Sequence, residues 1–219
     1  MKLFEFYRRF ARAYLNTEEN RKKRAWEVGL FEKYLKSPVL DLAGGAGVIA
    51  KVLEAKGFEV VLADYSHFML ATSDIERRVC CDAKLVPFKD ESFYSVLFWG
   101  NPYPHFSFGE ILKVFEEIKR VLKRGGVFIT AVFDLIKLGV DGEYKIKLDE
   151  GDHWSEQVEF DPVSLKVKRV YRDERGEEEF EFYLWSPAFV KWAFEVIGFE
   201  VLEERTFYED KSWLFVCKK

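Results

Sequence analysis

The chain has 219 residues, 48% of them hydrophobic and 17% aromatic, which is enough apolar material for the core of one large domain, or of one domain with a modest insertion. Its formal net charge of −4 argues against a nucleic-acid-binding surface, because phosphate contacts require clustered basic side chains. No apolar run approaches the roughly 18 residues of a membrane span, and Lys2, Glu5 and Arg8 interrupt any secretory leader, so we expect a soluble, cytoplasmic protein with no membrane partner.

The amino-acid composition also bears on the temperature and the redox state of the protein's environment. Charged residues make up 33% of the chain, whereas glutamine and asparagine are rare, a bias that resembles proteins from hot environments. The three cysteines, Cys80, Cys81 and Cys217, lack the spacing of a zinc site or a redox motif. We therefore expect reduced thiols and no bound metal.

Two helices are predicted before the first strand. Apolar side chains recur at helical spacing over residues 2–15 and again over residues 18–36. Pro38 ends the second helix, because the residue before a proline disfavours the helical conformation. Residues 1–37 are thus expected to form a pair of N-terminal helices.

Strands and helices then alternate. Helix starts are predicted at Ser66 and at Ser107, where Ser107 and Glu110 form a capping box, and the helix after Ser107 is expected to end at Gly125-Gly126. This alternation predicts a parallel sheet with helices on both faces. The strands are predicted at residues 39–42, 58–63, 78–81, 95–99 and 127–133.

The hydrophobic period changes to two over residues 140–185. Apolar and polar residues alternate at 163–167 and at 180–184, with a polar turn at 172–176 between the two runs. We predict an antiparallel insertion of three or four strands. It either caps a substrate or forms the surface of a homodimer through its edge.

The last segment returns to the first pattern. Ser186 and Pro187 predict the start of a helix that ends at Gly198, with two strands after it. The chain therefore predicts an α/β fold, with a doubly wound, seven-stranded, mostly parallel sheet whose last strand is antiparallel, and an inserted antiparallel β cap after the fifth strand. The expected domain limits are 1–37 for the N-terminal helices, 38–139 and 186–219 for the sheet domain, and 140–185 for the cap.

A glycine-rich turn follows the first strand, with the sequence DLAGGAG from Asp41 to Gly47. Small residues let the backbone approach a ligand closely, and the next helix offers free N–H groups. The turn fits a nicotinamide or flavin fingerprint, because Gly45, Gly47 and Ala50 match G-x-G-x-x-A and Asp64 follows about 20 residues on. It also fits a methyl-donor site, or a structural turn without a ligand.

Three further segments distinguish between these interpretations. They are ADYSHFML from Ala63, CDAKLVPFKDESF from Cys81, and Gly125-Gly126 after a helix. In this order and spacing, the motifs resemble the class I, Rossmann-like S-adenosylmethionine-dependent methyltransferases of the small-molecule type. The resemblance covers roughly residues 38–133 and 186–217. It departs from the family at Ala43, which replaces the first glycine and is tolerable if its φ stays negative, and at Tyr94, which replaces an acid.

The resemblance implies S-adenosylmethionine as the cofactor. Asp41 would help to hold the turn and the methionine end, Asp64 would accept both ribose hydroxyls, and Asp82 would accept from the adenine amino group. In related enzymes an N-terminal helix often covers the cofactor, which would place Arg12 or Tyr14 near its carboxylate; simple packing of that helix is the alternative. The expected cofactor contacts are Asp41, Ala43, Gly44, Gly45, Gly47, Asp64, Tyr65, Met69, Asp82, Ala83, Trp99, Tyr14 and Arg12.

The acceptor is expected beyond the fourth strand, because ligands of open α/β sheets bind at the C-terminal strand ends. There the segment WGNPYPHF from Trp99 resembles a broken NPPY motif, and resembles more closely small-molecule methyltransferases with a histidine nearby. A general base is required only if the acceptor starts protonated. His105 is the first candidate and Tyr103 the second, while a packing role for His105 is the alternative.

These observations predict methyl transfer from S-adenosylmethionine to a small-molecule acceptor, at nitrogen, oxygen or a carboxylate, by in-line displacement. A methyltransferase that acts on RNA or protein is the alternative, although the acidic balance makes nucleic acid the poorer partner. An NAD-dependent oxidoreductase and a cofactor-binding module without catalysis are the remaining options.

Overall fold

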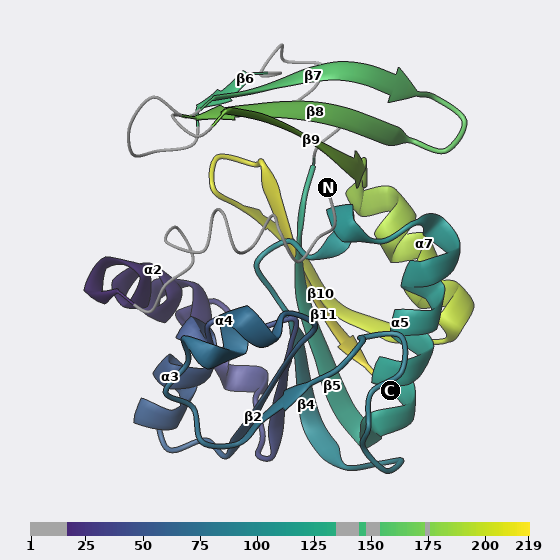
Figure 1. Ribbon diagram of the computed structural model, residues 1–219. Helices are drawn as coiled ribbons and strands as arrows, with labels where there is room; N and C mark the ends of the chain where they lie inside the picture. The colour runs from purple at the N-terminus through teal and green to yellow at the C-terminus, as the bar shows by residue number, and fades with distance from the viewer. Residues whose placement is uncertain (1–16, 135–144, 148–153, 174–175) are drawn as a thin grey trace.

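The computed structural model describes residues 17–134, 145–147, 154–173 and 176–219, and a seven-stranded sheet forms its centre (Figure 1). The strand order is β10-β11-β5-β4-β1-β2-β3. β11 runs antiparallel to both β5 and β10, while the other pairings are parallel, which confirms the predicted sheet. The strands are β1 (Val39–Leu42), β2 (Val60–Asp64), β3 (Arg78–Cys80), β4 (Phe93–Phe98), β5 (Leu122–Phe133), β10 (Glu200–Phe207) and β11 (Ser212–Lys218).

Helices cover both faces of this sheet (Figure 1). On one face, Val28, Phe31 and Ile49 pack against strand residues such as Leu62 and Leu97. On the other face, Phe115 and Phe194 belong to a second, aromatic-rich core. The helices are α2 (Glu18–Gly29), η2 (Glu32–Tyr34), α3 (Val48–Ala55), α4 (His67–Ala71), η3 (Tyr103–His105), α5 (Phe108–Val121) and α7 (Pro187–Ile197). None of the described helices is both long and apolar enough to cross a membrane.

The predicted helix caps are confirmed. The Ser66 hydroxyl accepts a hydrogen bond from the backbone N–H of Met69 at 3.3 Å, and Ser107 and Glu110 form the expected capping box. Ser186 caps α7, and Gly198 ends it with φ 83°. These local signals fix where α4, α5 and α7 begin.

Two predicted helix limits are wrong. The helix expected over 18–36 ends at Gly29, because Phe31 leaves the helical conformation and buries its ring against Trp99, 4.6 Å between centroids. The helix expected to run to Gly125 ends at Val121, because the extended Leu122 already pairs with Phe93 of β4. The helix predicted over 2–15 lies outside the described residues.

The insertion is a separate four-stranded antiparallel sheet, β6-β7-β8-β9, placed beyond the C-terminal end of β5 (Figure 1). It rests on the main domain through β9, whose Phe182 ring lies 5.6 Å from the His105 ring. Val163 and Leu165 were expected in a strand but lie in the turn before β8, with Val163 93% exposed. The strands are β6 (Lys145–Lys147), β7 (Trp154–Asp161), β8 (Lys166–Asp173) and β9 (Gly176–Tyr183).

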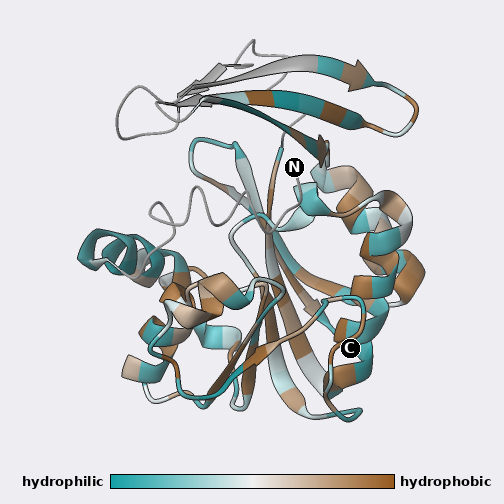
Figure 2. Cartoon of the chain, viewed as in Figure 1, coloured by the Kyte–Doolittle hydropathy of each residue, from teal (hydrophilic) through white to brown (hydrophobic). Residues whose placement is uncertain are grey.

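Hydropathy follows this architecture. Figure 2 shows hydrophobic residues along the central strands and on α7, whereas α2 is almost entirely hydrophilic. Only two α2 residues, Glu27 and Val28, are buried. The hydrophobic effect alone therefore gives α2 little reason to dock, and polar contacts must fix its position.

One arginine on α5 holds the segment that joins β3 to β4. The Arg120 guanidinium donates to the carbonyl oxygens of Phe88 at 2.7 Å and Val86 at 3.0 Å. It also pairs with Glu117 at 2.7 Å and with Asp90 at 2.8 Å. The guanidinium can bind these two carbonyls and two carboxylates at once because it is planar and has five N–H donors.

We expect Arg120→Lys to lower the free energy of unfolding by about 1–2 kcal/mol, because an ammonium cannot reproduce the fork geometry. Urea unfolding at neutral pH measures this loss. Arg124→Lys is the matched control, since the Arg124 side chain is 92% exposed and its change should stay within about 0.5 kcal/mol. Equal losses in the two variants would contradict the assignment.

Candidate functional site

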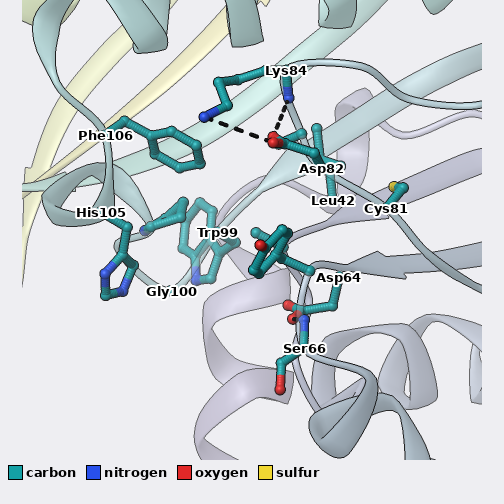
Figure 3. A pocket seen from close by; sticks show the side chains of 14 residues that line it. Leu42, Asp64, Ser66, Cys81, Asp82, Lys84, Trp99, Gly100, His105 and Phe106 are labelled. Atoms are coloured by element: carbon teal, nitrogen blue, oxygen red, sulfur yellow. Dashed lines mark hydrogen bonds and ion pairs between the residues drawn. The ribbon is translucent and has the colours of Figure 1, made fainter. Parts of the chain in front are cut away.

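The C-terminal ends of β1, β2 and β4 meet at one edge of the main sheet, and a cavity of about 260 Å³ opens there. Figure 3 shows Asp64 and Asp82 on one side of it, His105 and Phe106 on the opposite side, and Trp99 between them. The lining residues are Leu42, Ala43, Asp64, Tyr65, Ser66, Cys81, Asp82, Ala83, Lys84, Trp99, Gly100, Pro102, His105 and Phe106.

A second cavity of about 90 Å³ continues from the first and passes along the glycine-rich turn. The two share Ala43, Asp64, Trp99 and Gly100, so they form one curved site. Its walls are the turn after β1, α2 and the start of α3. The remaining lining residues are Asn20, Arg24, Asp41, Gly44, Gly45, Ala46, Val48, Ile49 and Met69.

The turn leaves no room for side chains on its inner side. A Cβ on Gly44 would lie 2.5 Å from Leu62 and 2.6 Å from the Asp41 carboxyl carbon, and one on Gly47 would lie 2.8 Å from the Ser73 hydroxyl. Gly47 also has φ 75°. Glycine at these positions therefore lets the backbone pass between β1 and β2 and present N–H groups to the cavity.

Ala43, at the start of the glycine-rich turn, adopts a left-handed backbone conformation. Its φ is 58°, so the expectation of a negative φ at this position is wrong. The residue after Ala43 is tied to β2, because the Gly44 backbone N–H donates to the Ala63 carbonyl at 3.2 Å and a Cβ on Gly44 would overlap Leu62. An L-residue in this region is strained by about 1 kcal/mol or more.

Asp41 is a buried carboxylate at the end of β1. It is 1% exposed, and within the described part of the chain its Oδ2 atom has no hydrogen-bond partner. Burial raises the pKa of Asp41 to about 7. A buried acceptor in the wall of a cavity suits a cationic or N–H-donating ligand, which would supply the missing partner.

Asp64 ends β2 and lies against the turn. Its Oδ2 accepts from the backbone N–H of Gly45 at 2.8 Å, and its Oδ1 accepts from that of Ser66 at 2.7 Å. Burial raises the pKa of Asp64, while these two N–H donors favour its ionised form. Each carboxylate oxygen has two acceptor positions, so both can take a further hydroxyl donor.

Asp82 follows β3 and lies on the same side of the cavity as Asp64 (Figure 3). Its Oδ1 accepts from the backbone N–H of Lys84 at 2.9 Å, which orients the carboxylate. The Lys84 ammonium pairs with Glu110 at 2.8 Å and thereby lowers the pKa of Glu110 to about 2. The Lys84 ammonium also lies 3.7 Å from Asp82 Oδ2, so Asp82 and Glu110 share this cation, and a ligand would use the acceptor positions of Asp82 that Lys84 leaves.

Several known proteins that resemble this chain are methyltransferases. A family model described as "Methyltransferase domain" matches residues 39–126. A demethylmenaquinone methyltransferase from Clavibacter sepedonicus is 36% identical over 120 residues, which cover 47% of this chain and 46% of the relative. The chain therefore spans about half the length of the curated relatives it matches.

The whole described fold also recurs in solved structures. The PH0226 protein from Pyrococcus horikoshii OT3 superposes with a TM-score of 0.80 at 28% identity, over 99% of both chains. An S-adenosylmethionine-dependent methyltransferase from Clostridium acetobutylicum ATCC 824 superposes with a TM-score of 0.72 at 18% identity, over 98% of this chain and 96% of that chain. Residues 39–126 of this chain therefore match a methyltransferase domain, and the described fold is similar to that of an S-adenosylmethionine-dependent methyltransferase.

The two cavities together fit S-adenosylmethionine. The glycine turn provides a narrow backbone cradle, and the orphaned oxygen of Asp41 requires a donor or a cation. Asp64 and Asp82 offer acceptors at two places along the larger cavity. A nucleoside with an amino-acid tail presents a diol, an exocyclic amine and an ammonium, which are the donors that these acids require.

Most of the sequence-predicted cofactor residues line the curved site. Ala43, Gly44, Gly45, Asp64 and Asp82 border it, and Gly47 supports the turn from behind. Tyr65 lies at the rim and is 58% exposed, whereas Met69 is buried beneath the turn. Arg12 and Tyr14 lie outside the described residues.

Asn20 and Arg24 of α2 are among the lining residues that were not predicted from the sequence. They are four residues apart and so lie on one helix face. Arg24 is the one basic side chain that borders the smaller cavity in the described structure. Their spacing was visible in the sequence, but nothing in it showed that this face of a hydrophilic helix meets the glycine turn.

The two predicted catalytic candidates occupy different environments. His105 lines the larger cavity, and burial lowers its pKa to about 4, so it is neutral at physiological pH. Tyr103 is fully buried, and its hydroxyl pairs with that of Thr130 at 2.8 Å in the core. Burial raises the pKa of Tyr103 well above its ordinary value. The structure therefore places Tyr103 in the core and away from the cavity.

The strain at Ala43 generates a stability prediction. Ala43→Gly should raise the free energy of unfolding by about 0.5–1 kcal/mol, because relief of the left-handed strain exceeds the extra chain entropy that glycine has when unfolded. Ala46→Gly is the control, since Ala46 has an ordinary negative φ and should become less stable. Chemical denaturation measures both, and destabilisation by Ala43→Gly would contradict the strain.

Proposed function

We propose that this methyltransferase moves a methyl group from S-adenosylmethionine to a small molecule enclosed between the main sheet and the inserted sheet. The observation that supports this most directly is the curved site itself. Acids that match a nucleoside lie at one side of it, and a wall of Trp99, His105 and Phe106 lies at the other. The inserted sheet contacts the wall of this cavity, because the Phe182 ring lies 5.6 Å from the His105 ring. A cavity of about 260 Å³ has room for a small acceptor rather than for a folded RNA or protein.

The chain's own residues would hold the cofactor in an extended form. Asp64 would accept the ribose hydroxyls, Asp82 the adenine amino group, and Arg24 would pair with the carboxylate beside the glycine turn. When bound, S-adenosylmethionine supplies an electrophilic methyl group on a sulfonium. With the nucleoside and the carboxylate held at the two ends, this methyl would lie near Trp99 and Gly100, where the two cavities join.

The acceptor would lie against Gly100, Pro102, His105 and Phe106. Neutral His105 could take a hydrogen bond from a hydroxyl or N–H of the acceptor and so direct its lone pair at the methyl group. With a pKa of about 4, His105 is a weak base, so we assign it the orientation of the acceptor, while the proton of the methylated product passes to water. The name of the Clavibacter relative, a demethylmenaquinone methyltransferase, agrees with a small-molecule acceptor.

Isothermal titration of the protein with S-adenosylmethionine and with NAD tests the proposal. We expect binding of S-adenosylmethionine and no measurable binding of NAD, because the acids are placed for a single nucleoside with a cationic tail. Tight NAD binding without S-adenosylmethionine binding would overturn the proposal.

Asp82 should determine recognition of the base. We expect Asp82→Ala to weaken S-adenosylhomocysteine binding about tenfold, through loss of a charge-assisted hydrogen bond to the amino group. Binding of S-inosylhomocysteine, which has a carbonyl in place of that amine, should change much less. The dissociation constants of both ligands, measured for the wild type and for Asp82→Ala, test this role. An equal loss of affinity for the two ligands would show that Asp82 does not recognise the amino group.

His105 should also make stability depend on pH. The unfolded chain protonates this histidine near pH 6.5, but the folded protein does so only near pH 4. The unfolded state therefore binds more protons than the folded state between these pH values. Acidification through this range should lower the free energy of unfolding of the wild type by about 1–3 kcal/mol, and His105→Asn should not show this loss. Urea unfolding from pH 4.5 to 7.5 measures it. The exposed His67→Asn should follow wild type, and identical curves for all three would contradict the burial of a neutral His105.

A further inference from the structure

Glu27 is the one acidic residue of α2 that is buried, at 2% exposure, and three donors converge on it. Its Oε2 accepts from Trp99 Nε1 at 2.8 Å and from Arg24 Nη1 at 2.5 Å. Its Oε1 accepts from the Tyr208 hydroxyl at 2.6 Å. A carboxylate taken this far out of water must be fully paired, and this one is.

The three donors come from distant parts of the chain. Arg24 lies one turn before Glu27, Trp99 follows β4, and Tyr208 lies in the turn between β10 and β11. Two of the donors, Arg24 and Trp99, line the smaller cavity with their remaining surface. The Glu27 carboxylate thus fixes two walls of the candidate cofactor site from behind.

The turn that carries Tyr208 is strained. Tyr208, Glu209 and Asp210 have φ of 51°, 55° and 62°, so three successive residues other than glycine are left-handed. The backbone N–H of Lys211 donates to the Tyr208 carbonyl at 3.1 Å and closes the turn. Strain of this kind persists where the surroundings enforce it, often beside a functional site. Here the strained turn directs the Tyr208 hydroxyl at Glu27.

We propose that Glu27 and Tyr208 are positioning residues for the amino-acid end of the cofactor. Glu27 holds one edge of the Arg24 guanidinium, which leaves the other edge for a carboxylate, and Tyr208 anchors Glu27 from the C-terminal hairpin. The position of the hydrophilic helix α2 over the glycine turn then depends on the last two strands of the sheet. The inference rests on the proposed cofactor site.

A comparison of two ligands tests it. S-adenosylhomocysteine carries the amino-acid carboxylate, and 5′-deoxy-5′-methylthioadenosine lacks it. We expect Tyr208→Phe to raise the dissociation constant of the first about five- to tenfold and to leave that of the second within about twofold. Glu27→Gln, which keeps an acceptor for Trp99 but removes the charge beside Arg24, should act in the same direction.

Tyr34→Phe is the matched control. Its hydroxyl donates to Glu203 of β10, so it also joins the N-terminal segment to the C-terminal hairpin, but it contacts neither Arg24 nor Trp99. A loss of thermal stability is expected in both phenylalanine variants, and a change in ligand preference only in Tyr208→Phe. If wild type binds neither ligand, the proposed function fails. If wild type prefers S-adenosylhomocysteine, and Tyr208→Phe weakens both ligands equally or neither, the positioning role is wrong.

Discussion

The narrow passage of the backbone from Asp41 to Gly47 constrains the rest of the site. The turn runs so close to Leu62 and to the Asp41 carboxylate that a side chain at Gly44 would overlap both. This closeness forces Ala43 into the left-handed region and brings the N–H of Gly45 onto Asp64. The same path therefore shapes the cradle, orients the acid at the end of β2 and buries the acid at the end of β1. The shape of the cradle and the backbone strain at Ala43 thus belong to the same turn.

Two buried carboxylates beside the site differ in how fully they are hydrogen-bonded. Asp41 keeps an oxygen without a partner in the described structure, whereas Glu27, equally buried, has both oxygens occupied. Burial of an unpaired carboxylate is unfavourable, so Asp41 has a pKa near 7 and is ready to gain from a cationic ligand. We therefore propose that Glu27 positions its neighbours, whereas Asp41 contacts the ligand. On the acceptor side, the same burial keeps His105 neutral.

Local chemistry made much of this predictable from the sequence. The helix starts were predictable from the caps at Ser66, Ser107 and Ser186, and the strands from the alternation of apolar segments. Asp64, Asp82 and the glycine turn are far apart in the sequence. They meet because parallel strands end at one edge of the sheet. Contacts between distant segments were not predictable. Arg24, which borders the smaller cavity, is bound to Glu27, and Glu27 accepts from Tyr208, 181 residues further along the chain. The turn at Ala43 likewise runs against Leu62 of β2. Tyr103 resembled a cavity residue but its neighbours draw it into the core.

The central claim is that one curved site holds S-adenosylmethionine with its base at Asp82, its ribose at Asp64 and its carboxylate at Arg24. A crystal structure of the protein with S-adenosylhomocysteine measures this directly. We predict ribose oxygens within hydrogen-bond distance of both Asp64 oxygens, the adenine amine on Asp82, and the sulfur facing the junction beside Trp99 and Gly100. A cofactor in the reverse orientation, or bound away from the glycine turn, would contradict the account.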